Sequence, residues 1–600
     1  MTFTWVQQPV ELIIQGPVLT AGETFSSWGT DSSFYRDFNG RLALPGSHVR
    51  GKLREALKDV LSLEGISEDF LARWFGKESH KDTGIPDAYS PHRGVLKITD
   101  FLIPKEAAPL DQVLTRIRIE PETGVVSQGA LMAFETPFSS GKETHWHGFV
   151  EFFSAPEEIG MTLEYLKKAF CFISALGREK TIGFGRLTKV VFGEKIQSLP
   201  ESPLAEEYIY PGLKIAIKPE EAFMIGGVRH NQNVFKSDAV ISGKVIKGAF
   251  ATGLNRIAGN DNLSLIIDGN NKKVSALYPE LAEYFGELVI NHAIPCLEEY
   301  NRPCTIPLSV VKYGDRHEDV TFLSPEDIFS ENEQPVTFQV DWKKTPDSIP
   351  KKYILPDLEY FPVTRTAIEY ETRRADEGKL YSFHMIKPFI NESTQVCWNS
   401  RIIFPQGLEP AKHLALAGQI RAAFPLALKY LGKRQSRVTV MNCPEKGPAP
   451  DYHITPGSRF AVILQTQALM INPESMAECA QPCFDDRDSL HRLYQEFWDT
   501  VWGADTVKLS HFYATQELQG GYLGVRFNPK QYSPFYLTSK GSVFVFKACS
   551  EKINILLNKI LRSGLPLPGW VGEPKGPRHP FAPQNGFGEI KIIMEKGGDK

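Results

Sequence analysis

Two segments combine glycine with basic side chains at a spacing that suits a phosphate group. The first is Pro45-Gly46-Ser47, followed by apolar residues at helical spacing (Val49, Leu53, Leu57, Val60 and Leu61), which predicts a helix with Ser47 as its N-cap. Arg50 and Arg54 lie four residues apart and therefore on one side of that helix. A helix start with free N–H groups, a glycine that permits close approach and two arginines suit a phosphate. The simpler alternative is a capped helix with a solvated basic face.

The second segment, LGREKTIGFGR (176–186), joins a predicted helix to a predicted strand. Gly183 and Gly185, together with Arg178, Lys180 and Arg186, would let the backbone lie against a ribose-phosphate chain. A plain β-turn is the alternative interpretation.

These motifs recur along the chain in the same order, which indicates a duplicated domain. TRIRIEPETGVVSQGAL (115–131) matches TRTAIEYETRRADEGKL (364–380) at an offset of 249, pairing Arg116 with Arg365. Gly46–Gly51 matches Gly243–Gly248 at an offset of 197, which brings in Lys244 and Lys247. Leu176–Arg178 matches Leu431–Lys433 at an offset of 255, with Arg434 next, and Gly183-Phe184-Gly185 recurs as Gly586-Phe587-Gly588.

The repeats predict three domains, at 1–197, 208–442 and 443–600, with an insertion at about 260–350 in the second. A chain of 600 residues suits two to four domains. The TRxxIExET segments are too polar for a core, so we expect projecting β-hairpins, the first turning at Glu122-Thr123-Gly124.

Composition limits the function classes. Lys and Arg number 67 against 71 Asp and Glu, a net charge of −4, which excludes nucleic-acid binding through bulk positive charge and requires a local groove or shared binding. The eight cysteines are irregularly spaced and predict free thiols, and no metal ligands are assigned from spacing. No apolar run is long enough to span a bilayer and no secretory leader is evident, so a cytoplasmic protein is expected.

Together these motifs resemble the RAMP superfamily, the repeat-associated subunits of CRISPR effector complexes. The run from Asp31 through Arg36 to Arg54, the 115–120 segment and the 177–186 loop resemble the Cas-seven-type backbone subunit of type III complexes, and residues 209–600 resemble the longer type III-D subunit. The resemblance implies an α+β fold of tandem ferredoxin-like (RRM-like) domains with insertions, each an antiparallel sheet with helices on one face. The implied partners are CRISPR guide RNA, target RNA, other type III RAMP backbone subunits, the large Cas-ten subunit and, as further candidates, small subunits; no membrane is involved.

Asp31 matches the aspartate that cuts target RNA in catalytic members of the family, with Arg36 in register five residues later. The implied reaction is attack of a ribose 2′-OH on the neighbouring phosphate, aided by a divalent cation, Mg or Mn, with no metal ligands assigned. Asp31 would either hold that ion or accept the proton. The alternative is an ordinary turn residue.

The second copy departs from this pattern. An offset of 197 places Val228 opposite Asp31, and the loop Met224–Ser237 contains no Asp or Glu, so this copy is expected to bind RNA without cutting it. The first hypothesis is therefore a fused backbone subunit, a metal-dependent endoribonuclease only within the assembled complex. The second is a non-catalytic scaffold whose sister subunits cut. The third is a guide-processing endoribonuclease that uses His48 or His230.

Overall fold

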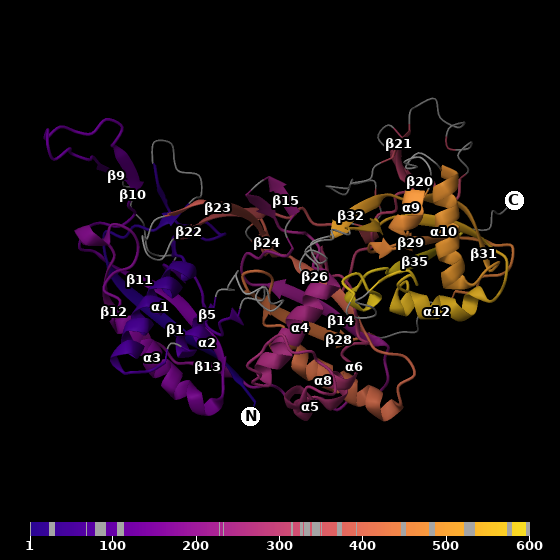
Figure 1. The fold of residues 1–600 in the computed structure, drawn as a ribbon, viewed down its shortest axis with the longest axis horizontal. Coiled ribbons are helices and arrows are strands. Elements are labelled where there is room, and N and C mark those ends of the chain that lie inside the picture. Colours follow the sequence, from indigo (N-terminus) through magenta and orange to yellow (C-terminus); the bar gives the residue numbers. More distant parts are fainter. Residues whose placement is uncertain are drawn as a thin grey trace.

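The computed structural model describes residues 2–22, 31–67, 69–77, 92–104, 113–226, 228–231, 233–313, 316–323, 328, 336–338, 349, 351–353, 355–368, 375–391, 393–445, 452–478, 487–520, 534–572 and 579–595. These residues form three α+β units in a row along the longest axis of the molecule (Figure 1). We call them the first unit (4–198), the second unit (212–444) and the third unit (459–594).

The first unit is built around β1 (Thr4–Gln15), which pairs antiparallel with β11 (Glu143–Ser154) and with β12 (Arg186–Phe192). The short strands β7 (Lys97–Ile98) and β8 (Phe101–Leu102) pair with the far side of β11, and β13 (Ile196–Ser198) pairs with β1. Alternate β1 residues Val6, Val10, Leu12 and Ile14 are buried in one core with residues of α1 (Gly46–Leu63) and α3 (Ile159–Cys171). The strand order matches that of a ferredoxin-like βαββαβ unit.

The second unit repeats this arrangement. Its central strand β14 (Gly212–Pro219) lies between β26 (Cys397–Ile403) and β28 (Ser436–Pro444). Beyond β26 come β17 (Val289–Ile290) and β18 (Ile294–Cys296). The helices are α4 (Gly243–Ile257) and α8 (Pro410–Ala427), joined by α5 (Lys272–Leu277) and α6 (Pro279–Tyr284). Much of the 260–350 segment thus belongs to the sheet and helices of this unit, whereas β19 (Val310–Tyr313), β20 (Arg316–Asp319) and β21 (Val336–Phe338) form a separate sheet.

The third unit follows the same order with little sequence similarity. The strand β29 (Arg459–Leu464) lies between β34 (Val543–Ala548) and β35 (Ile590–Met594), and β31 (Val507–Tyr513) pairs with β34. Its helices are α10 (Arg487–Trp502) and α12 (Ile553–Ser563). The α10 tryptophans Trp498 and Trp502 are stacked and fully buried beneath this sheet.

In the described part of the chain, each unit carries a β-hairpin between its second and third sheet strands. These hairpins are β9–β10 (Val113–Arg116 and Met132–Glu135), β22–β23 (Tyr360–Ile368 and Ala375–Ile386) and β32–β33 (Gln516–Gly520 and Pro534–Thr538). All three lie on the same side of the row of sheets (Figure 1). The first hairpin projects and turns where expected, since Gly124 has φ +64° and donates to the Glu120 carbonyl at 2.9 Å. The third hairpin was not anticipated from the sequence.

Buried ion pairs join neighbouring units. Glu151 on β11 is fully buried and accepts hydrogen bonds from Arg437 Nη1 (2.6 Å) and the Tyr430 hydroxyl (2.9 Å), both from the second unit. Arg302 binds Glu589 of the third unit through two hydrogen bonds of 2.6 and 2.7 Å. The Arg302–Glu589 pair is bidentate and therefore fixes orientation as well as proximity between the second and third units. None of the helices in the described ranges is long and apolar enough to cross a membrane.

Candidate RNA-binding and cleavage site

The first helix of each of the first two units begins at a glycine whose N–H is already bonded. Gly46 donates to Asp100 Oδ1 at 2.7 Å, and Gly243 donates to His292 Nδ1 at 3.2 Å. The predicted N-cap at Ser47 is wrong, because the helix begins at Gly46 and Ser47 lies exposed in its first turn. Since the protein's own carboxylate binds the N–H of Gly46, that group is not open to a phosphate.

Two predicted phosphate-binding cations of these helices contact the protein instead. Arg50 donates to the Phe75 carbonyl at 2.8 Å, and the Lys247 ammonium donates to the carbonyls of Gly286 and Leu288 at 2.9 and 2.8 Å. Each cation also lies over an aromatic ring, at 5.3 and 5.7 Å. Lys247 is 7% exposed, and burial lowers its pKa to about 7. The two residues repeat one arrangement at equivalent positions and are both bonded to the protein, so their RNA contacts stay predictions that these bonds do not favour.

The other basic residues of these helices, Arg54 and Lys244, are both exposed but differ in their contacts. Lys244 places its ammonium 5.5 and 5.6 Å from the ring centres of Phe581 and Phe587 in the third unit, so it bridges two units.

The glycine-rich turn of the first unit has two packed glycines and one open one. A Cβ on Gly177 or Gly185 would lie 2.5 or 1.8 Å from a backbone oxygen, whereas Gly183 has open space around it. All three have positive φ. Arg178 and Arg186 are exposed beside Gly183, so this part of the turn is accessible to a ligand.

The turn is anchored to the helix and to the hairpin. His48 Nε2 accepts a hydrogen bond from the Gly177 N–H at 2.9 Å. Burial, with the charges of Lys180 and Lys52, lowers the pKa of His48 to about 4, so its ring is neutral at neutral pH. Arg116 at the end of β9 forms an ion pair with Glu179 in the turn. The ion pair thus ties the hairpin base to the turn.

The second unit repeats the turn geometry. Lys433 donates its N–H to the Met224 carbonyl at 3.0 Å, as Arg178 does to Leu19 at 2.7 Å. The Lys433 side chain is exposed. The next residue, Arg434, is half-buried, and its charge acts on Tyr35 of the first unit. This equivalence supports the offset of 255 found in the sequence.

The third glycine pair shares the local geometry of the first but not its exposure. Gly586 and Gly588 have φ of +86° and +71°, close to the +94° and +66° of Gly183 and Gly185. Both are buried, and a Cβ on Gly586 would lie 2.5 Å from His292 Nδ1. The loop packs against the second unit, so the RNA contact of these two glycines stays a prediction that their burial does not favour.

Asp31 lies exposed at the foot of the projecting hairpin. Its Oδ2 accepts a hydrogen bond from the Ala133 N–H at 2.7 Å, and its own N–H donates to the Ala133 carbonyl at 2.8 Å. Arg36, predicted to contact RNA, forms an ion pair with Glu135 on β10, and the other Glu135 oxygen accepts the Phe34 N–H at 2.8 Å. These contacts fix the Asp31 loop to the hairpin.

The second unit places valine at the Asp31 position. Ser32, which follows Asp31, pairs in parallel with Phe134, and Phe235, which follows Val234, pairs in parallel with Phe383. The hairpin offset of 249 maps Phe134 to Phe383. Val234 rather than Val228 is therefore the counterpart of Asp31, because the loop is longer than a constant offset assumes. Neither valine can supply a carboxylate.

The described residues contain no group of three or more His, Cys, Asp or Glu side chains arranged to hold a metal ion. A complete protein cage is thus not formed there. Mg²⁺ often uses one or two carboxylates together with substrate phosphates, and the exposed Asp31 carboxylate fits that limited role.

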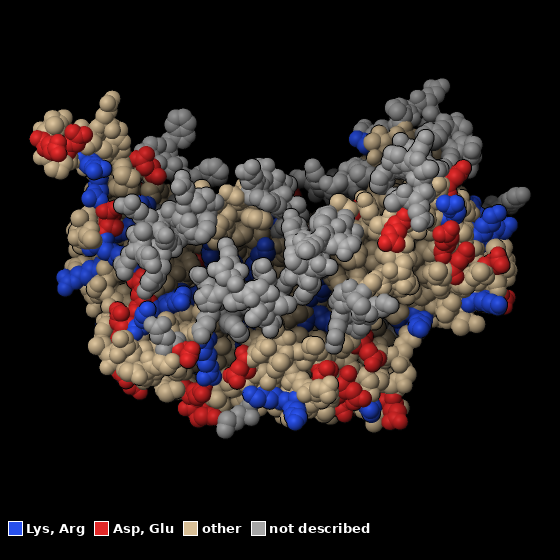
Figure 2. Space-filling view, viewed as in Figure 1, with Lys and Arg blue, Asp and Glu red and all other residues tan. Residues whose placement is uncertain are grey.

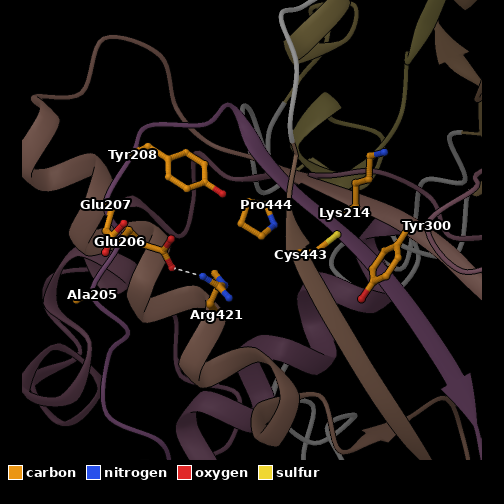
Figure 3. Close-up of a pocket in the computed structure, with 9 residues that line it drawn as sticks. All are labelled: Ala205, Glu206, Glu207, Tyr208, Lys214, Tyr300, Arg421, Cys443 and Pro444. Atoms are coloured by element: carbon orange, nitrogen blue, oxygen red, sulfur yellow. Dashed lines mark hydrogen bonds and ion pairs between the residues drawn. The ribbon is translucent and has the colours of Figure 1, made fainter.

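A cavity of about 710 Å³ lies elsewhere, at one end of the second sheet (Figure 3). It is lined by residues that include Tyr208, Lys214, Tyr300 and Arg421, and Arg421 is paired with Glu206 at 2.5 Å. None of its lining residues belongs to the repeated motifs. We therefore assign the candidate site to the hairpin side, where Figure 2 shows Lys and Arg side chains within the central recess.

Comparison with known proteins gives one family match, which lies within the first unit. No curated protein matches the chain. One solved structure, the cryo-EM structure of the type III-B Cmr-beta bound to cognate target RNA, contains a chain that is 12% identical, with a TM-score of 0.24; the match covers 31% of this chain and 96% of that chain. Residues 15–188 match the model of the RAMP superfamily. The first unit, with its hairpin, its glycine-rich turn and Asp31, is a RAMP superfamily domain.

Proposed function

We propose that this chain is a fused backbone subunit of a type III, III-D-like CRISPR complex, which binds guide and target RNA and cleaves the target at Asp31. The observation that carries the proposal is an exposed carboxylate fixed at the foot of a projecting hairpin in a RAMP domain. The three hairpins on one side of the row would meet a single RNA strand at intervals (Figure 1). The net charge of −4 fits a subunit that shares its RNA with sister RAMP subunits and a Cas-ten subunit.

The cleavage chemistry follows from the placement of Asp31. The 2′-oxygen of one ribose attacks the neighbouring phosphorus and the 5′-oxygen leaves, which requires these atoms in line. The hairpin would kink the strand to reach this geometry, while one Asp31 oxygen, held by Ala133, orients the other toward the 2′-OH proton. A bound Mg²⁺ or Mn²⁺ would supply charge neutralisation at the phosphate. Val234 offers no such oxygen in the second unit.

The test is Asp31→Ala in the assembled complex with guide and target RNA. We expect one cleavage position to disappear while guide RNA binding stays within about twofold, because Asp31 is acidic and adds nothing to phosphate attraction. Val234→Asp provides the matched control at the equivalent position of the second unit. Unchanged target products in Asp31→Ala would favour the scaffold hypothesis, in which sister subunits cut.

The guide-processing alternative is weaker at His48. A general acid–base histidine needs a pKa near the working pH and access to substrate. The pKa of His48 is lowered to about 4 and its Nε2 is bonded to Gly177. The side chain of His230 is outside the described residues.

A further inference from the structure

One position in the glycine-rich turn is acidic in the first unit and basic in the second. In the first unit, Arg116 pairs with Glu179. The offset of 249 maps Arg116 to Arg365, and the offset of 255 maps Glu179 to Arg434. The backbone supports both assignments, because Arg116 pairs with Met132 as Arg365 pairs with Tyr381, and the turns share their hydrogen bonds. An ion pair in one unit is therefore a pair of guanidinium groups in the next.

Both arginines are half-buried at positions equivalent to those of the first unit's ion pair. Burial lowers the pKa of Arg365, and the charge of Arg434 is the next largest cause. In the described part of the chain neither arginine forms an ion pair with a carboxylate, and Arg434 Nη1 contacts Met385 Sδ at 3.3 Å. Like charges at a partly desolvated site repel more strongly than in water, so this pair favours an anion between or beside them.

The nearby carboxylates are already bonded to other groups. Asp100 of the first unit is close enough to raise the pKa of Arg365, but its Oδ1 accepts the Gly46 N–H at 2.7 Å and its Oδ2 accepts the Tyr35 hydroxyl at 3.0 Å. The charge of Arg434 also acts on Glu221, which forms an ion pair with Lys97 and accepts the Arg437 N–H at 2.7 Å. Two carboxylates that already bind other groups leave the charge of the two arginines incompletely balanced.

We propose that Arg365 and Arg434 form a clamp for an RNA backbone phosphate at the junction of the first and second units. This inference rests on the proposed function. Guanidinium groups bind phosphate oxygens through paired N–H donors and stay charged when partly buried. The charges of both arginines act on the hydroxyl of Tyr35, which follows Asp31 by four residues, so a phosphate held here would fix the strand near the Asp31 loop. The hairpin base of the second unit would thus be closed by RNA, whereas that of the first is closed by its own ion pair.

Arg434→Glu tests the clamp because it recreates the first unit's pairing. Binding of a labelled oligouridine RNA is measured by fluorescence anisotropy over a range of salt concentrations. Arg434→Glu should lose both contacts, since Arg365 would bind the new carboxylate. The slope of log affinity against log salt should fall by about 0.7, the value for one phosphate contact with a single strand. Arg434→Gln should change the slope by less than Arg434→Glu, because Arg365 would still face the phosphate. Arg492→Glu, an exposed α10 site with the same change of charge, should change the slope little.

The melting temperature without RNA separates the remaining outcomes. Arg434→Glu should melt at the same or a higher temperature than the wild type, and a lower value would show that Arg434 serves a protein partner, which contradicts the clamp. A slope equal to that of Arg492→Glu would also overturn it. If inorganic phosphate stabilises the wild type but RNA slopes do not change, the site binds a free anion rather than RNA. A wild-type chain that binds no RNA would refute the proposed function, and the phosphate shift would still test the anion site.

Discussion

The His48 ring makes the first unit sensitive to acid, and the size of this effect can be worked out. An unfolded histidine protonates near pH 6.5, whereas the folded His48 has a pKa of about 4. Between these values the unfolded state binds more protons, so stability is full above pH 6.5 and falls as the pH drops toward 4. For one group with these two pKa values the loss at pH 5 is about 2 kcal/mol.

His48→Gln removes this titration and leaves a side-chain oxygen or nitrogen near Gly177. Between pH 7 and pH 5, we expect the free energy of unfolding to fall by about 2 kcal/mol less in the variant than it falls in the wild type. Urea denaturation at both pH values measures it. His145→Gln is the control, because His145 is 49% exposed. If His48→Gln and the wild type lose the same free energy of unfolding, His48 is not a buried neutral ring. If His48→Gln abolishes RNA cleavage by the isolated chain, the guide-processing hypothesis is supported instead.

Further predictions concern the junctions and the turn. Arg437→Met should lower the free energy of unfolding by about 3–5 kcal/mol, because it leaves the fully buried Glu151 without its cation, and Glu151→Gln in the same chain should restore most of the loss in denaturant titrations. The free energy of unfolding of the wild type relative to Lys247→Met should rise by about 2 kcal/mol between pH 7 and 9. The pKa of Lys247 in the folded state lies below that of an unfolded lysine, so the unfolded state binds more protons in this range. A constant difference between the two proteins would contradict burial of the charge. Gly185→Ala should be far more destabilising in thermal melts than Gly183→Ala, because a Cβ at 185 meets a backbone oxygen at 1.8 Å, whereas Gly183→Ala adds only the left-handed strain of about 1–2 kcal/mol.

The repeated glycines could be predicted because backbone geometry requires them. Gly177 and Gly432 both lie against a carbonyl with positive φ, so Leu-Gly followed by a basic residue recurs at these two turns. The equivalence of the first two hairpins could also be predicted, because the sequence offset pairs Thr115 with Thr364. In the structure their partners are Ala133 and Ser382, and each of these is followed by a phenylalanine. Glycine and β-pairing leave a local signature in sequence.

The partners of the charged residues could not be predicted in this way. Lys247 looks like a phosphate contact in sequence, but its carbonyl partners come from a loop about 40 residues away. Asp100 carries no motif and yet bonds the helix start and Tyr35. Burial of Gly586 depends on how the third unit docks. These outcomes are set by tertiary packing, which short-range patterns do not encode.

The three turns suggest why one chain would use the same fold in different ways. Their backbones are constrained, because a side chain at Gly185 or Gly588 would meet backbone atoms. The charges beside them are free to vary: Glu179 closes the first hairpin without RNA, whereas Arg434 cannot close the second. A cleavage site must hold its carboxylate in place before the substrate arrives. The closed hairpin therefore suits the unit that carries Asp31, and the open one suits a unit that only binds.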